Sequence, residues 1–320
     1  MKTAFIFPGQ GSQFVGMAKD FYDALPECRD IVDRAASCLD FDLKSVMFEQ
    51  NELINKTEYT QACLLTAEVC ILEAVKKFVG ADVAAGLSLG EYAALVAAGV
   101  MSFEDAVKTV RKRGQFMEYA VPGGKGGMAA VIGLDGDTVK KVCKTVSSEM
   151  TMTVVTANYN CPGQIVISGH REAVEAAAEK LRAANARLVT VLNVSGPFHS
   201  PLLSEAGDKL KESLGGVKLN NPVIPYVTNV TAKVIDDCSV VKDLLVRQVS
   251  SSVKWEQSVT EMRNAGVETF IEIGPGKTLA GFMKRIDRDI NVITVNTVED
   301  LEKLASAVGG QNVGSKHTAA

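Results

Sequence analysis

The sequence lacks several features that mark other classes of protein. Net charge is −4 over 320 residues, so there is no overall positive field to hold nucleic acid or an anionic membrane. No segment approaches the roughly 20 apolar residues of a membrane span, and the apolar run ending at Phe7 is too short for a signal peptide. We therefore expect neither nucleic acid nor a membrane as a partner.

Cysteine is present, but not in the patterns that form disulfide frameworks or zinc sites. The seven cysteines are an odd number and include no C-x-x-C pair. Reduced thiols in the cytoplasm are the simplest interpretation. With 47% hydrophobic residues, a chain of this length can bury a large core. We expect one large domain or one domain that carries an insertion.

The chain is organised around a G-x-S-x-G pentapeptide at residues 86–90. It lies between an apolar run, 82–85, and a helical stretch, 91–98, which is the setting of a nucleophile elbow. Only small residues can flank the serine, because the turn is strained and the helix passes close behind the strand. Ser88 would expose its Oγ above N–H groups that can stabilise an oxyanion. A chance match among 27 glycines is the alternative.

Two other glycine-rich loops imitate nucleotide-binding motifs and fail them. The loop at 8–13 would need a third glycine where Phe14 stands, and the loop at 274–278 would need a P-loop glycine where Ile271 stands. The first loop follows a predicted strand, so its backbone N–H groups are available, and Gln10 adds a side-chain amide.

The order of the expected elements predicts an α/β fold in two parts. After the glycine-rich segment 122–127 the pattern becomes strand–helix–strand–strand–helix–strand, which is the ferredoxin-like order. We predict a core of residues 1–124 and 195–308, an inserted ferredoxin-like subdomain at 125–194, and a disordered polar tail at 309–320. In the core we expect helices near 27–39, 60–78, 103–119, 241–249 and 253–265, and strands near 3–7, 223–228 and, as the last strand, 269–273.

Several polar residues on the core helices have ordinary interpretations. Ser102 and Asp105 form a capping box that opens a helix through about Tyr119. The basic cluster at 111–113 is typical of a solvated helix face, and Gln61 is typical of a solvated polar residue.

A serine nucleophile needs a base that is active near neutral pH, and histidine is the usual one. Of the three histidines, His317 lies in the polar tail and His170 in the small subdomain. His199 lies in the core, on a loop where Ser200 is a plausible N-cap and Pro201 a plausible first helical residue. His199 is therefore favoured by elimination. No acid stands out in the order of a catalytic triad, and a backbone carbonyl is an alternative group to orient the ring.

Six motifs together resemble the malonyl-CoA:acyl-carrier-protein transacylases of bacterial fatty-acid synthesis. They occur in that family's order, and the resemblance runs from residue 3 to about 290. The motifs are FPGQGSQ at 7–13, GLSLGEY at 86–92, RG at 113–114, NCPGQ at 160–164, FHS at 198–200 and EIGPG at 272–276.

The resemblance implies a hydrolase-like parallel-sheet core with a ferredoxin-like insertion. It also implies a ping-pong acyltransferase that moves malonyl from malonyl-CoA, through an ester on Ser88, to the phosphopantetheine thiol of acyl carrier protein. His199 would be the general base and acid. Backbone N–H groups of Gln10 and Leu89 would form the oxyanion hole. This chemistry needs no metal or redox cofactor. We expect a cytoplasmic monomer.

The same resemblance assigns substrate-binding roles. Arg113 would hold the malonyl carboxylate with two parallel hydrogen bonds. Gln61 would line the pocket, and the main-chain carbonyl of Gln248 would orient the His199 ring. From its bulk and position, Phe198 is expected to narrow the pocket against a branched malonyl group.

One departure from the family is plain, because Leu87 stands where the family usually has histidine before the serine. That histidine is not the family's base, so we expect catalysis to survive. Two other functions remain in competition. A serine esterase or thioesterase would share the elbow and use water as the acceptor, and a docking or scaffold protein would keep the fold without the reaction.

Overall fold

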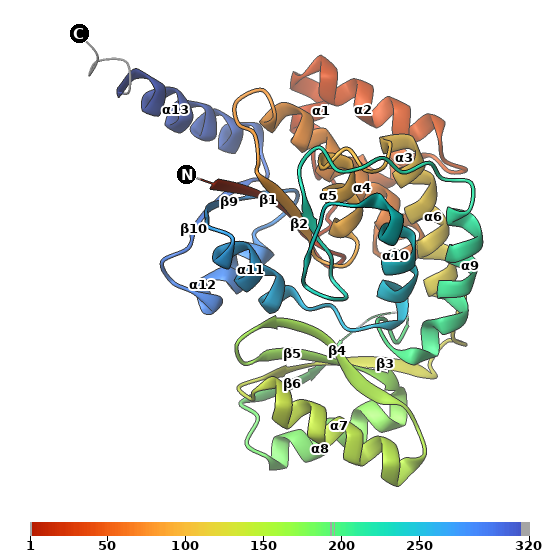
Figure 1. Cartoon of the computed structure of the whole chain (residues 1–320). Coiled ribbons are helices and arrows are strands. Elements are labelled where there is room, and N and C mark those ends of the chain that lie inside the picture. Colours follow the sequence, from red (N-terminus) through yellow and green to blue (C-terminus); the bar gives the residue numbers. More distant parts are fainter. Residues whose placement is uncertain (1, 193, 195, 315–320) are drawn as a thin grey trace.

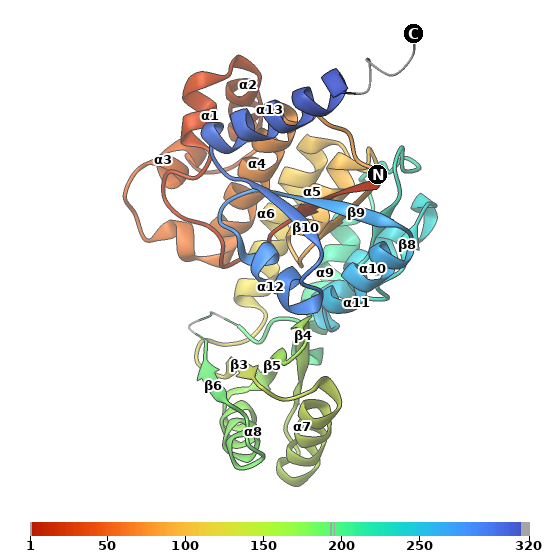
Figure 2. The same cartoon turned by 90° about the vertical axis from the view of Figure 1, so that its left-hand side faces the viewer.

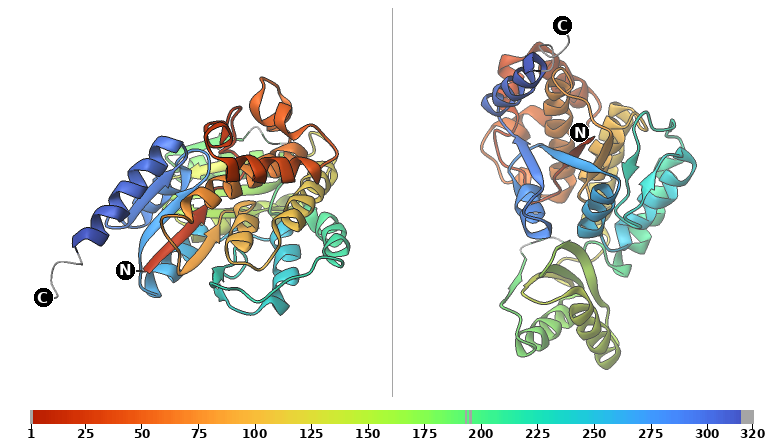
Figure 3. Two further views of the ribbon diagram at one scale, coloured as in Figure 1. Left: turned by 90° about the horizontal axis from the view of Figure 1, so that it is seen from above. Right: turned by 60° about the vertical axis from the view of Figure 1, so that its left-hand side comes forward.

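The computed structural model describes residues 2–192, 194 and 196–314 (Figure 1). The chain forms a large α/β core, with a small sheet and two helices beneath it in this view. Figure 2 shows that this small part projects from one end of the core, and Figure 3 gives the same arrangement from two further sides. Within the described residues, no helix combines the length and the apolar character needed to cross a bilayer.

Among the described residues, the core is built on a six-stranded sheet of order β10-β9-β1-β2-β7-β8. Neighbouring strands run parallel except β7 and β8, which are antiparallel. The strands are β1 (Lys2–Phe7), β2 (Val83–Gly86), β7 (Tyr226–Val227), β8 (Val234–Ile235), β9 (Val267–Ile273) and β10 (Asn291–Val295). The parallel strands β1, β2 and β7 therefore end at the same edge of the sheet.

Helices cover both faces of this sheet because alternate side chains of each strand point to opposite sides. On β1, Phe5 and Phe7 join one apolar cluster, while Ala4 and Ile6 join another. The first face is covered by α1 (Lys19–Ala24), α2 (Pro26–Ser37), α3 (Leu43–Phe48), α4 (Thr57–Val75), α5 (Gly90–Ala97), α6 (Phe103–Tyr119), α9 (Ser204–Leu214), α10 (Val241–Ser250) and α13 (Val298–Gly314). The second face is covered by α11 (Trp255–Asn264) and α12 (Thr278–Ile286).

The small part is an antiparallel sheet of order β4-β5-β3-β6. Its strands are β3 (Gly126–Ile132), β4 (Val154–Cys161), β5 (Gln164–His170) and β6 (Leu188–Val191). Helices α7 (Gly136–Met150) and α8 (Arg171–Ala183) lie on the side of this sheet away from the core (Figure 1). The predicted ferredoxin-like order and the predicted α/β class are confirmed. The exact domain boundaries stay predictions.

Two expectations about the C-terminal region are wrong. The strand at 269–273 is not the last, because the β-branched run 292–295 of β10 pairs beside it. The expected disordered tail at 309–320 does not begin at residue 309, because α13 continues to Gly314. This helix begins with a reciprocal cap, in which the Thr297 N–H donates to Asp300 and the Asp300 N–H donates to Thr297 Oγ1. Residues 315–320 of the predicted tail lie outside the described residues.

The prediction that a helix starts after His199 is confirmed at Pro201, but the prediction that Ser200 caps this helix is wrong. Pro201 opens a short 3₁₀ helix, Pro201–Leu203, which leads into α9. The Ser200 hydroxyl does not cap it and instead donates to the Pro197 carbonyl over 2.7 Å. This bond tightens the loop that carries His199.

Glu68 on α4 is a buried acid with an unfavourable environment. Its side chain is fully buried, and neither carboxyl oxygen has a hydrogen-bond partner within the described chain. Burial raises the pKa of Glu68 well above its usual value. Because the folded chain holds the proton of Glu68 more tightly than the unfolded chain does, Glu68 favours the folded state at low pH. This contribution to the free energy of unfolding is lost as pH rises from the unfolded pKa toward the raised pKa of the folded state.

We expect Glu68→Gln to raise the unfolding temperature at pH 8 by several degrees, because the amide is neutral at every pH. The gain should disappear near pH 4, where Glu68 is protonated in both folded and unfolded chains. Thermal unfolding followed by circular dichroism measures this, with Glu73→Gln on the more exposed side of α4 as control. An equal change in unfolding temperature at both pH values would contradict a raised pKa of Glu68 in the folded chain.

Candidate active site

The G-x-S-x-G segment forms a sharp turn between β2 and α5, with Ser88 in the left-handed region at φ 53°. A side chain at Gly86 would put its Cβ 2.0 Å from the Gly90 backbone. At Gly90 a Cβ would lie 2.3 Å from the Phe7 carbonyl oxygen. Glycine is therefore required at both positions, which accounts for the motif by packing.

Asn229, directly beyond β7, holds this turn from the neighbouring strand. Its Nδ2 donates to the Gly86 carbonyl over 2.7 Å, and its Oδ1 accepts from the Ser88 N–H over 2.6 Å. Both ends of the strained turn are thus tied to one side chain. No sequence pattern identified Asn229 as a site residue. Its position at the end of a strand parallel to β2 is the signal that would have found it.

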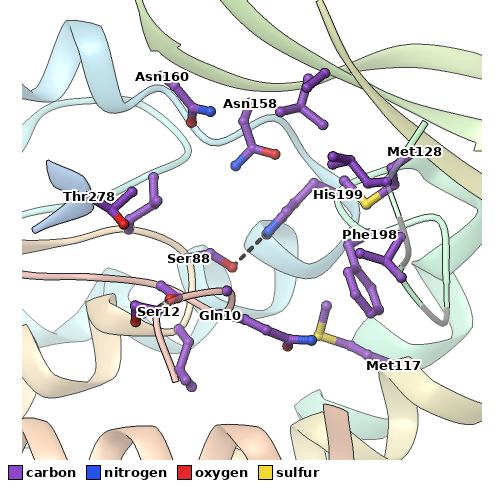
Figure 4. A pocket seen from close by; sticks show the side chains of 18 of the residues that line it. Gln10, Ser12, Ser88, Met117, Met128, Asn158, Asn160, Phe198, His199 and Thr278 are labelled. Carbon is purple, nitrogen blue, oxygen red and sulfur yellow. Dashed lines mark hydrogen bonds between the residues drawn. The ribbon is translucent and has the colours of Figure 1, made fainter. Parts of the chain in front are cut away.

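The structure brings His199 to Ser88, with 2.7 Å between His199 Nε2 and Ser88 Oγ (Figure 4). On the other side of the ring, Nδ1 lies 2.8 Å from the Gln248 carbonyl oxygen. A carbonyl can only accept, so Nδ1 carries the proton and Nε2 is free to accept from the serine hydroxyl. A main-chain carbonyl on α10, and not an acid, therefore orients the ring. This is one of the two arrangements that the sequence left open.

The His199 imidazole is neutral in this environment. Burial, together with the nearby Arg113 cation, lowers the pKa of His199 to about 4. A neutral ring bonded to a hydroxyl is the protonation state that a general base needs.

Arg113 reaches the nucleophile from α6 and is fully buried rather than solvated. Its Nη2 lies 3.2 Å from Ser88 Oγ and 2.9 Å from Gln248 Oε1, and its Nη1 lies 2.8 Å from Gln61 Oε1. The expectation of a solvated basic face is therefore wrong for Arg113. It is also wrong for Arg111, which pairs with Asp40 and Glu58. Both point inward because α6 packs along α4.

Gln61 and Gln248 position the guanidinium from two other helices. Gln61, on α4, is buried, so its expected solvated character is also wrong. Gln248 uses every polar group that it has. Its carbonyl faces His199, its side-chain oxygen faces Arg113, and its Nε2 donates to the Ser88 carbonyl and to Glu91.

The loop at 8–13 lies against the elbow, since a Cβ at Gly9 would come within 2.6 Å of the Leu87 carbonyl oxygen. Neither the Gln10 nor the Leu89 backbone N–H donates to an acceptor within the described part of the chain. The Gln10 side chain donates to Thr57 Oγ1 over 3.1 Å. The two N–H groups flank a pocket that contains Ser88 and are available for an oxygen of a bound group.

A cavity of about 290 Å³ opens above Ser88, between the core and the inner face of the small sheet. Phe198 and Leu87 contribute to its wall from the core. Asn158, Asn160 and Gln164 contribute from β4 and β5. All eight residues that the sequence reading proposed lie in or against this site: Ser88, His199, Gln10, Leu89, Arg113, Gln61, Gln248 and Phe198.

A family model and the most similar curated proteins that we compared all indicate an acyl transferase. A model described as "Acyl transferase domain" matches residues 4–304. The malonyl CoA-acyl carrier protein transacylase of Bacillus subtilis is 44% identical over 97% of this chain and 98% of its own length. The protein of the same name from Staphylococcus aureus strain MRSA252 is 45% identical over 94% of this chain and 97% of its own length.

Solved structures with a similar fold are transacylases as well. The malonyl CoA-acyl carrier protein transacylase of Clostridium perfringens superposes with a TM-score of 0.94 at 38% identity, covering 99% of this chain and 100% of its own. A malonyl-transacylase in complex with its type II PKS acyl-carrier protein superposes with a TM-score of 0.93, also at 38% identity, covering 96% and 100%.

The low pKa of His199 predicts how Ser88 reacts with a small uncharged serine reagent, such as a neutral phosphonate ester. The rate should stay nearly constant from pH 8 to pH 6 and fall only as pH approaches about 4, because only then does His199 take up a proton. A stopped assay of residual activity against time at each pH measures the rate. A midpoint near pH 6.5, the ordinary value for histidine, would show that burial does not set its basicity.

Proposed function

The chain belongs to the acyl transferase domain family, and from that premise we propose that it transfers malonyl from malonyl-CoA to the phosphopantetheine thiol of acyl carrier protein. The single observation that carries the proposal is the joint contact of Ser88 Oγ with His199 Nε2 at 2.7 Å and Arg113 Nη2 at 3.2 Å. A nucleophile, its base and a cation for a carboxylate thus meet at one atom. The product is the extender unit for fatty-acid synthesis.

We propose a ping-pong route in two half-reactions. His199 Nε2 accepts the proton of Ser88 Oγ while the oxygen attacks the thioester carbonyl of malonyl-CoA. The C–S bond then breaks, and the CoA sulfur takes the proton from His199. In the second half-reaction His199 accepts the proton of the pantetheine thiol and the sulfur attacks the carbonyl of the Ser88 ester. The C–O bond to Ser88 then breaks, and Ser88 Oγ takes the proton from His199.

The negative oxygen that develops in each half-reaction needs donors that are already in place. The Gln10 and Leu89 N–H groups are proposed for this role, since they lie beside Ser88 without acceptors of their own in the described chain. The remaining proton of the imidazolium is held by the Gln248 carbonyl, which keeps the ring aligned through both transfers.

Selection of malonyl over acetyl is assigned to Arg113, with Gln61 and Gln248 holding its guanidinium. Arg113 contacts no carboxylate within the described residues, and its Nε has no hydrogen-bond partner there. A malonyl carboxylate would pair directly with this buried cation, whereas acetyl would leave it without a carboxylate in contact. Buried groups left without partners allow discrimination of about 10⁴-fold.

Leu87 replaces the family's usual histidine on the wall of the pocket. Because Leu87 takes no part in the Ser88–His199–Gln248 chain of hydrogen bonds, the proposed mechanism does not require a histidine there.

No cofactor enters the proposed reaction, because the thioester supplies the acyl group and the chain supplies the nucleophile and the base. A cytoplasmic location is proposed because all seven cysteines are free thiols. That the protein acts as a monomer stays a prediction.

A serine esterase or thioesterase is the rival enzyme, and a scaffold protein is the rival without chemistry. The buried cation beside Ser88 favours the transferase, because hydrolysis of a simple ester gives it no partner.

The direct test is intact-mass spectrometry after brief incubation with malonyl-CoA. We expect a malonyl adduct on the wild type and none on Ser88→Ala, and the adduct should persist in buffer and disappear when a pantetheine thiol is added. Steady release of CoA without an adduct would indicate a hydrolase. Neither adduct nor turnover would indicate a protein without this activity.

Phe198 offers a test of pocket size, since its side chain lies beside His199 on the pocket wall (Figure 4). We expect Phe198→Ser to increase turnover of methylmalonyl-CoA relative to malonyl-CoA, because the smaller side chain leaves room for a branch. Initial rates with both substrates measure the ratio. An unchanged ratio would remove Phe198 from the list of specificity residues.

A further inference from the structure

Glu91, three residues after the nucleophile on α5, is a buried carboxyl that the proposed mechanism does not use. It is fully buried, yet its Oε2 accepts from Gln248 Nε2 over 2.6 Å and from the Asn229 N–H over 3.1 Å. Two donors on one oxygen suit an ionised carboxylate. Such a group needs a cation nearby if it is to remain charged in the interior.

That cation is Arg113, which lies on the other side of the same amide. Gln248 Nε2 faces Glu91, and Gln248 Oε1 accepts from Arg113 Nη2 over 2.9 Å. Within the described residues the hydrogen-bond partners of the guanidinium are all neutral oxygens, from Gln61, Ser88 and Gln248. Glu91 and Arg113 are therefore two buried charges joined by one amide.

We propose that Glu91 is the counter-charge of Arg113 in the empty site, and that it limits how strongly Arg113 attracts the malonyl carboxylate. This inference rests on the proposed function. When a malonyl carboxylate arrives, two negative groups share one cation. Glu91 then binds a proton more readily, and by the same linkage the enzyme with protonated Glu91 binds malonyl more tightly.

Glu91 titrates in a range where this linkage can be observed. Burial raises the pKa of Glu91 to about 7, against the opposing effects of Gln248, Asn229 and Arg113. The other titratable groups that act on it are Tyr92 of α5 and Tyr226 of β7. Burial raises the pKa of each phenol, so both stay neutral.

His199, beyond Gln248, has its pKa lowered to about 4 and is neutral above pH 6. Between pH 6 and pH 8.5, Glu91 thus changes charge, while the other named groups that act on it among the described residues keep theirs. Burial also raises the pKa of Glu272 to about 7, but that carboxyl accepts from the Leu279 and Ala280 N–H groups and not from Gln248.

The test measures the KM of ester formation for malonyl-CoA and for acetyl-CoA between pH 6 and pH 8.5. The quantity compared is the KM ratio, which is the KM for malonyl-CoA divided by the KM for acetyl-CoA. Both substrates carry the same CoA phosphates, so the ratio isolates the acyl carboxylate. In the wild type we expect the ratio to rise by about tenfold from pH 6 to pH 8.5, as Glu91 ionises. kcat should change little, because His199 and Ser88 are unaffected.

Glu91→Gln keeps an oxygen for Gln248 and Asn229 and removes the charge. We expect its ratio at pH 8.5 to match the wild-type ratio at pH 6 and to be independent of pH. The control is Glu104→Gln, which removes a half-buried carboxylate that pairs with Arg34 at the start of α6 and should leave the pH dependence unchanged.

A wild-type ratio that does not change with pH would overturn the proposal, even if Glu91→Gln fails to fold. So would a Glu91→Gln ratio that is raised at every pH, because that outcome would mean that Glu91 only orients Gln248. A wild type that forms no malonyl ester at all would count against the proposed function, and is thereby distinguished from a failure of this inference.

Discussion

The site depends on one constraint, which is that Ser88 must be held in a left-handed conformation at the end of β2. The helix behind it passes so close to the strands that a Cβ at Gly86 or Gly90 would overlap backbone atoms. The Asn229 side chain fixes both ends of the turn, at the Gly86 carbonyl and the Ser88 N–H. With the serine fixed in this way, the base, the cation and the donors can approach it from separate elements.

Gln248 connects these elements. Its carbonyl orients His199, its side-chain oxygen holds Arg113, and its side-chain nitrogen is held by the Ser88 carbonyl and Glu91. A single residue on α10 therefore holds both the His199 ring and the Arg113 guanidinium. Because these groups are buried, each hydrogen bond is strong and each unmade one is costly. The groups of the site are accordingly joined by hydrogen bonds before substrate arrives.

The sequence predicted the elements whose patterns are local. The elbow, the N-cap at Ser102 and the alternation of elements in the small sheet all depend on neighbours in the chain, and all are present. Of the expected capping box, the bond from the Asp105 N–H to Ser102 Oγ is formed. The helical pattern alone failed for Arg113 and Gln61, which look like surface residues until α4 and α6 pack together; only the family resemblance placed them at the site. Asn229 and Glu91 were not identified as site residues either, because their roles depend on partners more than 130 positions away.

Selection of a carboxylate by a prepositioned cation is the central claim of this account. The most direct measurement is the rate of ester formation on Ser88 from malonyl-CoA relative to acetyl-CoA, by intact mass at short times, in the wild type and in Arg113→Ala. We expect the wild type to form the ester much faster from malonyl-CoA than from acetyl-CoA. In Arg113→Ala we expect the rate with malonyl-CoA to fall to about the rate with acetyl-CoA, while the rate with acetyl-CoA stays unchanged. A variant that still prefers malonyl would contradict this account, and would require the carboxylate to be recognised by other groups in the pocket.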